Sequence, residues 1–225
     1  MLLVAAVAAI AVVAGSSYFV VGRSRTPGIV VGQGSDRLPS ESLTDWVTYG
    51  DHVVVATIET ERALPVSDEA LGRGEGLIGR RMTARVASTL WSRSGAAPLP
   101  SSLDLLVWGW VLQEGRRLPF TSEGSPRPVV GDTYVVPVTQ VAGGEWVLLA
   151  PSAIIPVSEG VMHAPPAKEV GVATPIARGY DGRPVDVLSK VLQGTTPDPA
   201  AQPFMKLDPD QRWASVIASH PPTKP

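Results

Sequence analysis

The 225-residue chain has no cysteine and only three histidines. Without cysteine it can form no disulfide framework, no thiol nucleophile, no cysteine-ligated metal site and no lipid anchor on a cysteine. His52, His163 and His220 lie far apart in the sequence, outside the spacings typical of metal sites, and no carboxylate cluster accompanies them. The sequence therefore predicts no metal site and no cofactor.

The chain also lacks an excess of basic residues: 19 Lys and Arg stand against 21 Asp and Glu, for a formal net charge of −2. A dedicated nucleic-acid-binding protein needs a concentrated basic face, so this balance argues against a nucleic-acid partner. One alternative stays open. Arg81 and Arg85 share a face of a predicted strand, and basic side chains beside an exposed aromatic ring are typical of single-strand binding.

The first 22 residues contain no charged side chain, and Arg23 and Arg25 follow them directly. At about 1.5 Å of rise per residue, such a helix crosses a hydrocarbon core of roughly 30 Å. The apolar run continues past Ala14–Ser17, where a signal peptidase could cut, so a retained anchor is favoured over a cleaved signal peptide. The predicted partner of residues 1–22 is thus the lipid bilayer, and the predicted location is the plasma membrane, crossed once.

Two interpretations of the orientation follow from the flanking charges. Applied to Arg23 and Arg25, the positive-inside rule places the domain that follows in the cytoplasm. We favour an extracytoplasmic domain, on the expectation that a basic segment is encoded upstream of Met1.

Composition divides the chain into four segments: an anchor (1–22), a linker (23–40), a β domain (41–163) and a proline-interrupted tail (164–225). The linker is rich in glycine, serine and proline and has no helical period. The tail contains two stretches with the apolar spacing of short helices, and we expect both helices to dock on the β domain or on a partner; they are 184–193 and 208–219.

The β domain opens with a predicted helix, because Ser42 and Asp45 form a capping-box pattern and Gly50 is suited to a left-handed end. Apolar or alternating runs with turn residues between them then predict strands, with loops over 64–76 and 113–130; the strands are 52–61, 78–91, 103–112, 133–138, 145–149 and a short edge strand at 154–157. The expected fold is mainly β: a small antiparallel β-barrel with an N-terminal transmembrane helix and short C-terminal helices.

A leading helix runs into an apolar strand (SLTDWVTYGDHVVVATIETE), and two further strands precede the run GDTYVVPV. In this order the segment from about 41 to 157 resembles small secreted or membrane-anchored bacterial proteins with an OB-like β-barrel, which are common in actinobacteria. The resemblance implies a fold and an envelope location. It carries over no functional residues.

No catalytic constellation is evident in the sequence. There is no G-x-S-x-G motif, and His52 beside Asp51 is expected to be a turn residue at the start of a strand. Glu59 and Glu61 share a strand face, roughly 7 Å apart at two rises of about 3.3 Å, but we expect both to be solvated. We therefore predict that the chain is not an enzyme. The alternative is an envelope hydrolase with a site assembled from dispersed residues, in which His52 or a buried carboxylate meets a hydroxyl in a pocket.

Trp108 and Trp110 are the candidate ligand-binding residues. They are two apart on a predicted strand, so both rings are expected on one face. Core packing is the favoured interpretation, with one face of the strand filling the barrel and the other packing beneath the tail helices. An exposed groove for a glycan, lipid or peptide is the functional alternative. The predicted function is a binding or scaffolding module at the cell envelope, with an envelope protein or a glycan as its partner.

Overall fold

The computed structural model describes residues 21–22, 29–32 and 36–219. Residues 1–20 of the predicted anchor, and His220, therefore lie outside the described residues. Within the described ranges no helix combines the length and the apolarity needed to cross a membrane.

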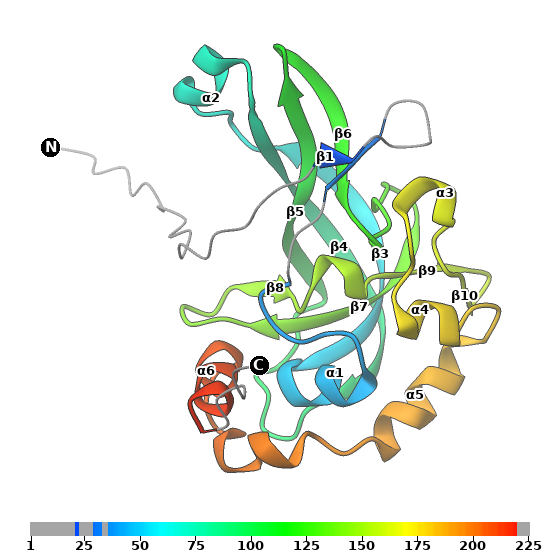
Figure 1. The fold of residues 1–225 in the computed structure, drawn as a ribbon. Helices are drawn as coiled ribbons and strands as arrows, with labels where there is room; N and C mark the ends of the chain where they lie inside the picture. The colour runs from blue at the N-terminus through cyan, green and yellow to red at the C-terminus, as the bar shows by residue number, and fades with distance from the viewer. Residues whose placement is uncertain (1–20, 23–28, 33–35, 220–225) are drawn as a thin grey trace, which may run out of the picture.

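A long, twisted sheet forms the centre of the molecule, and the mainly β prediction is confirmed (Figure 1). Its strands are hydrogen-bonded in the order β1-β2-β6-β5-β4-β3-β7-β9-β10, and β8 pairs with β7. The strands are β1 (Val21–Gly22), β2 (Val30–Gly32), β3 (His52–Ala63), β4 (Gly76–Ser92), β5 (Ser102–Gln113), β6 (Arg116–Ser122), β7 (Thr133–Gln140), β8 (Trp146–Leu148), β9 (Ile155–Ser158) and β10 (Val161–Met162).

The prediction of a closed antiparallel barrel is wrong. The sheet curls until β8 lies close to β5, but no ladder joins these two strands among the described residues. β8 is only three residues long, and the strand that pairs with the free side of β5 is β6, over Trp110–Gln113. The sheet is also mixed, because β2 runs parallel to β6.

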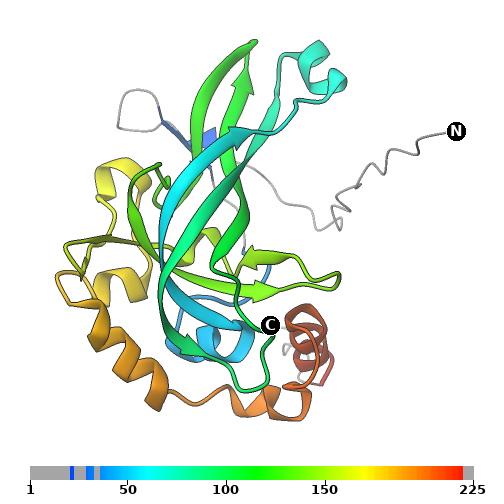
Figure 2. The same ribbon diagram turned by 180° about the vertical axis from the view of Figure 1, so that it is seen from behind.

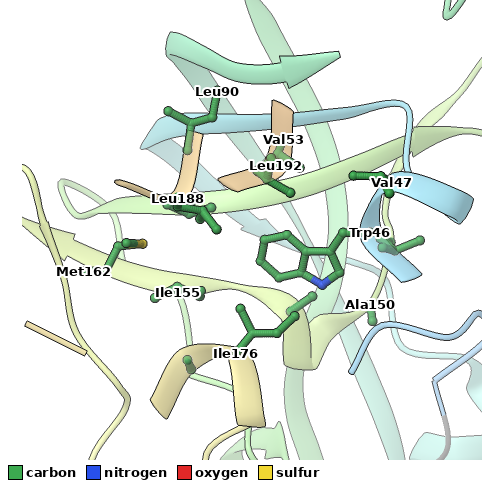
Figure 3. Close-up of a cluster of buried hydrophobic side chains, with 14 of the residues drawn as sticks. Trp46, Val47, Val53, Leu90, Ala150, Ile155, Met162, Ile176, Leu188 and Leu192 are labelled. Atoms are coloured by element: carbon green, nitrogen blue, oxygen red, sulfur yellow. The ribbon is translucent and has the colours of Figure 1, made fainter. Parts of the chain in front are cut away.

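Most of the helices lie together on one side of the sheet (Figures 1 and 2). A compact apolar cluster fills the space between these helices and the strands. Trp46 lies at the centre of this cluster with none of its surface exposed, and its Nε1 donates to the Ser40 carbonyl oxygen at 2.9 Å (Figure 3). A second cluster, which includes Met82 and Val136, fills the concave inner face of the curled sheet. The helices are α1 (Leu43–Tyr49), α2 (Asp68–Arg73), α3 (Ala167–Val170), α4 (Pro175–Gly179), α5 (Val185–Gly194) and α6 (Pro209–Ser219), with 3₁₀ turns at Pro151–Ala153 and Pro199–Phe204.

The helix predictions are largely confirmed. Ser42 caps α1, and the reciprocal bonds of the capping box with Asp45 are both present. Gly50 does end the helix, but in an extended conformation rather than a left-handed one, because the chain passes straight into β3. The predicted tail helices are α5 and α6, and α5 packs on β4.

Other elements differ from prediction: β2 lies in the predicted linker, and the tail contains α3 and α4 besides the two predicted helices. The expected loop 64–76 contains α2, which Ser67 caps, and the expected loop 113–130 contains β6. The expected edge strand at 154–157 is β9, which lies between β7 and β10, so it is not an edge. Pro119 within β6 weakened the strand signal, because proline cannot donate to a ladder.

Candidate functional site

A β-bulge at Gly109 places the two candidate tryptophans on opposite faces of β5. Trp110 pairs with Ile78 and Trp108 pairs with Gly79, so Gly109 is the extra residue between consecutive pairs. The predicted common face is therefore wrong, because one inserted residue reverses the alternation of side chains. Glycine within a strand is the sequence signal that indicates such a bulge.

We expect Gly109→Ala to destabilise the fold by about 1–3 kcal/mol in urea denaturation, because overpacking forces the neighbouring backbone to move. A Cβ at residue 109 would lie 2.9 Å from the Ile78 carbonyl oxygen and 3.3 Å from the Arg80 Cβ. Gly72→Ala is the control, since a Cβ there meets nothing within 4 Å. Equal midpoints for the two variants would contradict the bulge packing.

Trp108 belongs to an apolar surface on the outer side of the long strands, which we call the Trp108 face (Leu77, Leu106, Trp108, Val111 and Phe120). The pairs Leu77–Val111, Gly79–Trp108 and Arg81–Leu106 place these side chains on one side of the sheet. Leu77, Leu106 and Trp108 are 38%, 37% and 36% exposed. The Trp108 and Phe120 rings meet edge to face, with centroids 6.0 Å apart.

A groove of about 340 Å³ opens on this side of the sheet. Its volume is within the range of about 300–1,000 Å³ that is typical of small-ligand pockets. Its walls are mostly apolar, and they are formed by Gly32, Glu75, Gly76, Leu77, Val111, Leu112, Gln113 and Phe120.

The N-terminal strands border the same groove. β2 pairs with β6 through Val30–Phe120, and Gly32 lies so close to the Phe120 ring that a Cβ there would come within 2.5 Å of it. β1 pairs with β2 through Val21–Gly32. Val21 and Gly22, the last two residues of the uncharged segment, therefore pair with a strand that lines the groove, and both short strands lie beside β6 (Figure 1).

Trp110 lies on the inner face instead and is half-buried. The Arg127 guanidinium stacks over its ring, with Cζ 5.3 Å from the centroid. Trp110 therefore contributes to a buried polar cluster and not to the exposed groove.

The structure also brings His52 to a hydroxyl, that of Ser92, its cross-strand neighbour. His52 Nδ1 lies 2.8 Å from Ser92 Oγ, and Nε2 lies 2.9 Å from the Ala97 carbonyl oxygen. A carbonyl only accepts, so Nε2 carries a proton, and in the neutral imidazole Nδ1 then accepts from the serine hydroxyl. Ser92 was missed in the sequence because the β3–β4 register has irregularities that side-chain alternation does not show.

Within the described part of the chain, no carboxylate is hydrogen-bonded to this serine–histidine pair. The neighbouring Asp51 accepts from Arg93 Nη2 at 2.6 Å and from Thr139 Oγ1 at 2.9 Å. Its carboxylate therefore holds strand ends together and does not orient the His52 imidazole. Neither His52 nor Ser92 lines the groove, and neither lines the cavity beside α1, α4 and α6.

A larger, more polar cavity of about 740 Å³ lies where α1, α4 and α6 meet the loops before α1 and after β6. Two of its acidic side chains are already engaged: Asp36 accepts from Ser40 Oγ at 3.0 Å, and Asp45 accepts from the Ser42 amide at 2.8 Å. Across the described part of the chain, no three histidine or acidic side chains are grouped to hold a metal ion.

Comparison with known proteins adds no assignment to this geometry. No family model, no curated protein and no solved structure matches the chain.

Proposed function

We propose that this chain is a membrane-tethered binding module of the cell envelope, and that the groove on the Trp108 face holds an acyl chain of an envelope lipid. The observation that supports the proposal is the groove itself, which is lined by the partly exposed Leu77; Leu106 and Trp108 lie on the same face of the sheet but outside the lining. Exposed apolar surface of this kind costs free energy in water, and it is typical of binding sites.

The chemistry of the walls favours an acyl chain over a glycan. A sugar needs several hydrogen-bonding partners, whereas the only side chains with polar ends in the lining are those of Glu75 and Gln113. An apolar peptide, or another segment of this chain, is the competing occupant.

The tether is the second part of the proposal: the uncharged segment that precedes β1 crosses the plasma membrane once. The absence of charge over this segment supports it, and the β1–β2 pairing brings the end of this segment to the groove. A lipid would then be available where the groove opens. We further propose that the domain is extracytoplasmic. A reporter active only outside the cytoplasm, fused after Pro225, tests this; a stable but inactive fusion would refute that orientation.

Photocrosslinking tests the groove. We expect the full chain, reconstituted in vesicles that contain a phospholipid with a diazirine on its acyl chain, to crosslink within β5 and β6 on illumination. Leu77→Glu places a charge in the apolar groove and is expected to reduce this crosslink by roughly tenfold or more, because burying an unpaired charge is costly.

Leu207→Glu is the matched control, since Leu207 is 37% exposed and Leu77 is 38% exposed, and Leu207 lies outside the groove. Equal crosslinking of the two variants, or crosslinks confined to residues 1–22, would refute the acyl-chain site.

A serine hydrolase is the second candidate, because Ser92 Oγ lies 2.8 Å from His52 Nδ1. Triads orient and stabilise the histidine with a carboxylate, whereas His52 has only a backbone carbonyl for this role. We expect a fluorophosphonate probe to leave Ser92 unlabelled. Labelling of the natural chain that Ser92→Ala abolishes would establish the hydrolase in place of the binding module.

A further inference from the structure

A buried arginine on the inner face of the sheet has an unpaired donor. The Arg80 side chain is 0% exposed, forms an ion pair with Glu61, and donates from Nε to the Trp108 carbonyl oxygen at 3.0 Å. Its Nη2 is buried and has no hydrogen-bond partner among the described residues. Buried donors are nearly always satisfied, so an unpaired guanidinium nitrogen indicates a missing acceptor.

Arg127 repeats this pattern beside it. Its Nη2 donates to the Gly109 carbonyl oxygen at 3.3 Å, and its buried Nε has no partner among the described residues. Burial lowers the pKa of Arg80, and the nearby charge of Arg127 lowers it further. Burial likewise lowers the pKa of Arg127. Guanidinium groups nevertheless stay protonated in proteins, so both positive charges remain.

The charges of this cluster do not balance. Two guanidinium groups face one carboxylate, that of Glu61, whose side chain is 33% exposed. Among the described residues, one positive charge of this cluster therefore has no carboxylate partner, and two of its buried donors have no acceptor. A carboxylate supplies the balancing charge and both acceptors, because its two oxygens accept from two nitrogens at once.

We propose that Arg80 and Arg127 form a binding site for a carboxylate anion, with Arg80 Nη2 and Arg127 Nε as the donors. Because Glu61 is partly exposed and Arg127 is half-buried, we expect the anion to enter from solvent past these two side chains. Arg127 belongs to the loop between β6 and β7, and its bond of 3.3 Å to the Gly109 carbonyl oxygen is long. The site lies on the opposite face from the Trp108 groove and does not depend on it.

Arginine side-chain NMR tests the site on the full chain in detergent. We expect acetate to shift the Nε–H resonance of Arg127 in a saturable way, with chloride having little effect and phosphate serving as the second oxyanion. Arg127→Gln is expected to weaken acetate binding in calorimetry by roughly tenfold or more, because it removes a charged donor. Glu61→Gln is expected to strengthen binding, since it removes the competing carboxylate. Arg80 is left intact, because its loss could unfold the sheet.

Arg85→Gln is the control: Arg85 is also paired with a glutamate, Glu59, but its side chain is 56% exposed. It is expected to bind acetate as the natural chain does. An Arg127 resonance that acetate leaves unchanged would overturn the proposal. Equal shifts with acetate, phosphate and chloride would overturn the assignment to a carboxylate, as would equal affinities for the Arg127 and Arg85 variants.

Discussion

Replacing Trp46 by alanine is expected to lower the free energy of unfolding by about 3–5 kcal/mol, the usual cost of removing a large aromatic ring from a core. Trp46 is 0% exposed and contacts β strands and tail helices together (Figure 3). The variant also loses the indole donor to the Ser40 carbonyl, so a buried acceptor is left unpaired. Urea denaturation followed by circular dichroism measures the change.

Trp91→Ala is the control for the Trp46 variant. Trp91 packs against the same cluster but is only partly buried, so its truncation leaves a smaller cavity. We expect a clearly smaller loss of stability, and equal losses would show that Trp46 is not the centre of this core.

Replacing Asp51 by asparagine is also expected to lower the free energy of unfolding by about 3–5 kcal/mol, because it breaks a largely buried ion pair from one side. The Asp51 and Arg93 side chains are 4% and 18% exposed. The other Asp51 oxygen accepts from Thr139 Oγ1 at 2.9 Å and from the Gln140 amide at 2.8 Å. One carboxylate thus joins the start of β3, the end of β4 and the end of β7, and asparagine can neither neutralise Arg93 nor accept all these bonds.

Asp186→Asn provides the comparison. Asp186 pairs with Lys190 across one helical turn, but both side chains are more than half exposed. Exposed pairs of this kind contribute about 0.3–0.5 kcal/mol. A loss as small as this for Asp51→Asn would refute the structural role of the Asp51 network.

Local features of the fold could be predicted from the sequence because neighbouring residues determine them. The Ser42–Asp45 capping box and the β7–β8 hairpin follow from residues that lie close together in the chain. Features that depend on pairing between distant strands could not be predicted. The parallel contact of β2 with β6 joins Val30 to Phe120, and no local pattern in either strand indicates it.

The candidate site shows the same division. The apolar character of Trp108 was evident from the sequence, but its separation from Trp110 depends on the bulge, which is defined only relative to β4. Ser92 and the Arg80–Arg127 cluster became visible only once strand register and loop position brought these residues together. The types of residue in the candidate site could therefore be predicted from the sequence, but their arrangement in space could not.

The most direct test of the acyl-chain site uses the absence of cysteine in the natural chain, since any introduced cysteine is then the only labelling site. Leu77→Cys lines the groove, and Val191→Cys on α5 is a comparably exposed position outside it. Each variant carries a polarity-sensitive dye and is reconstituted in vesicles with or without phospholipids brominated on their acyl chains. We expect strong quenching of the dye at residue 77 and none at residue 191; equal quenching at both positions, or none at either, would contradict a groove that holds a lipid acyl chain.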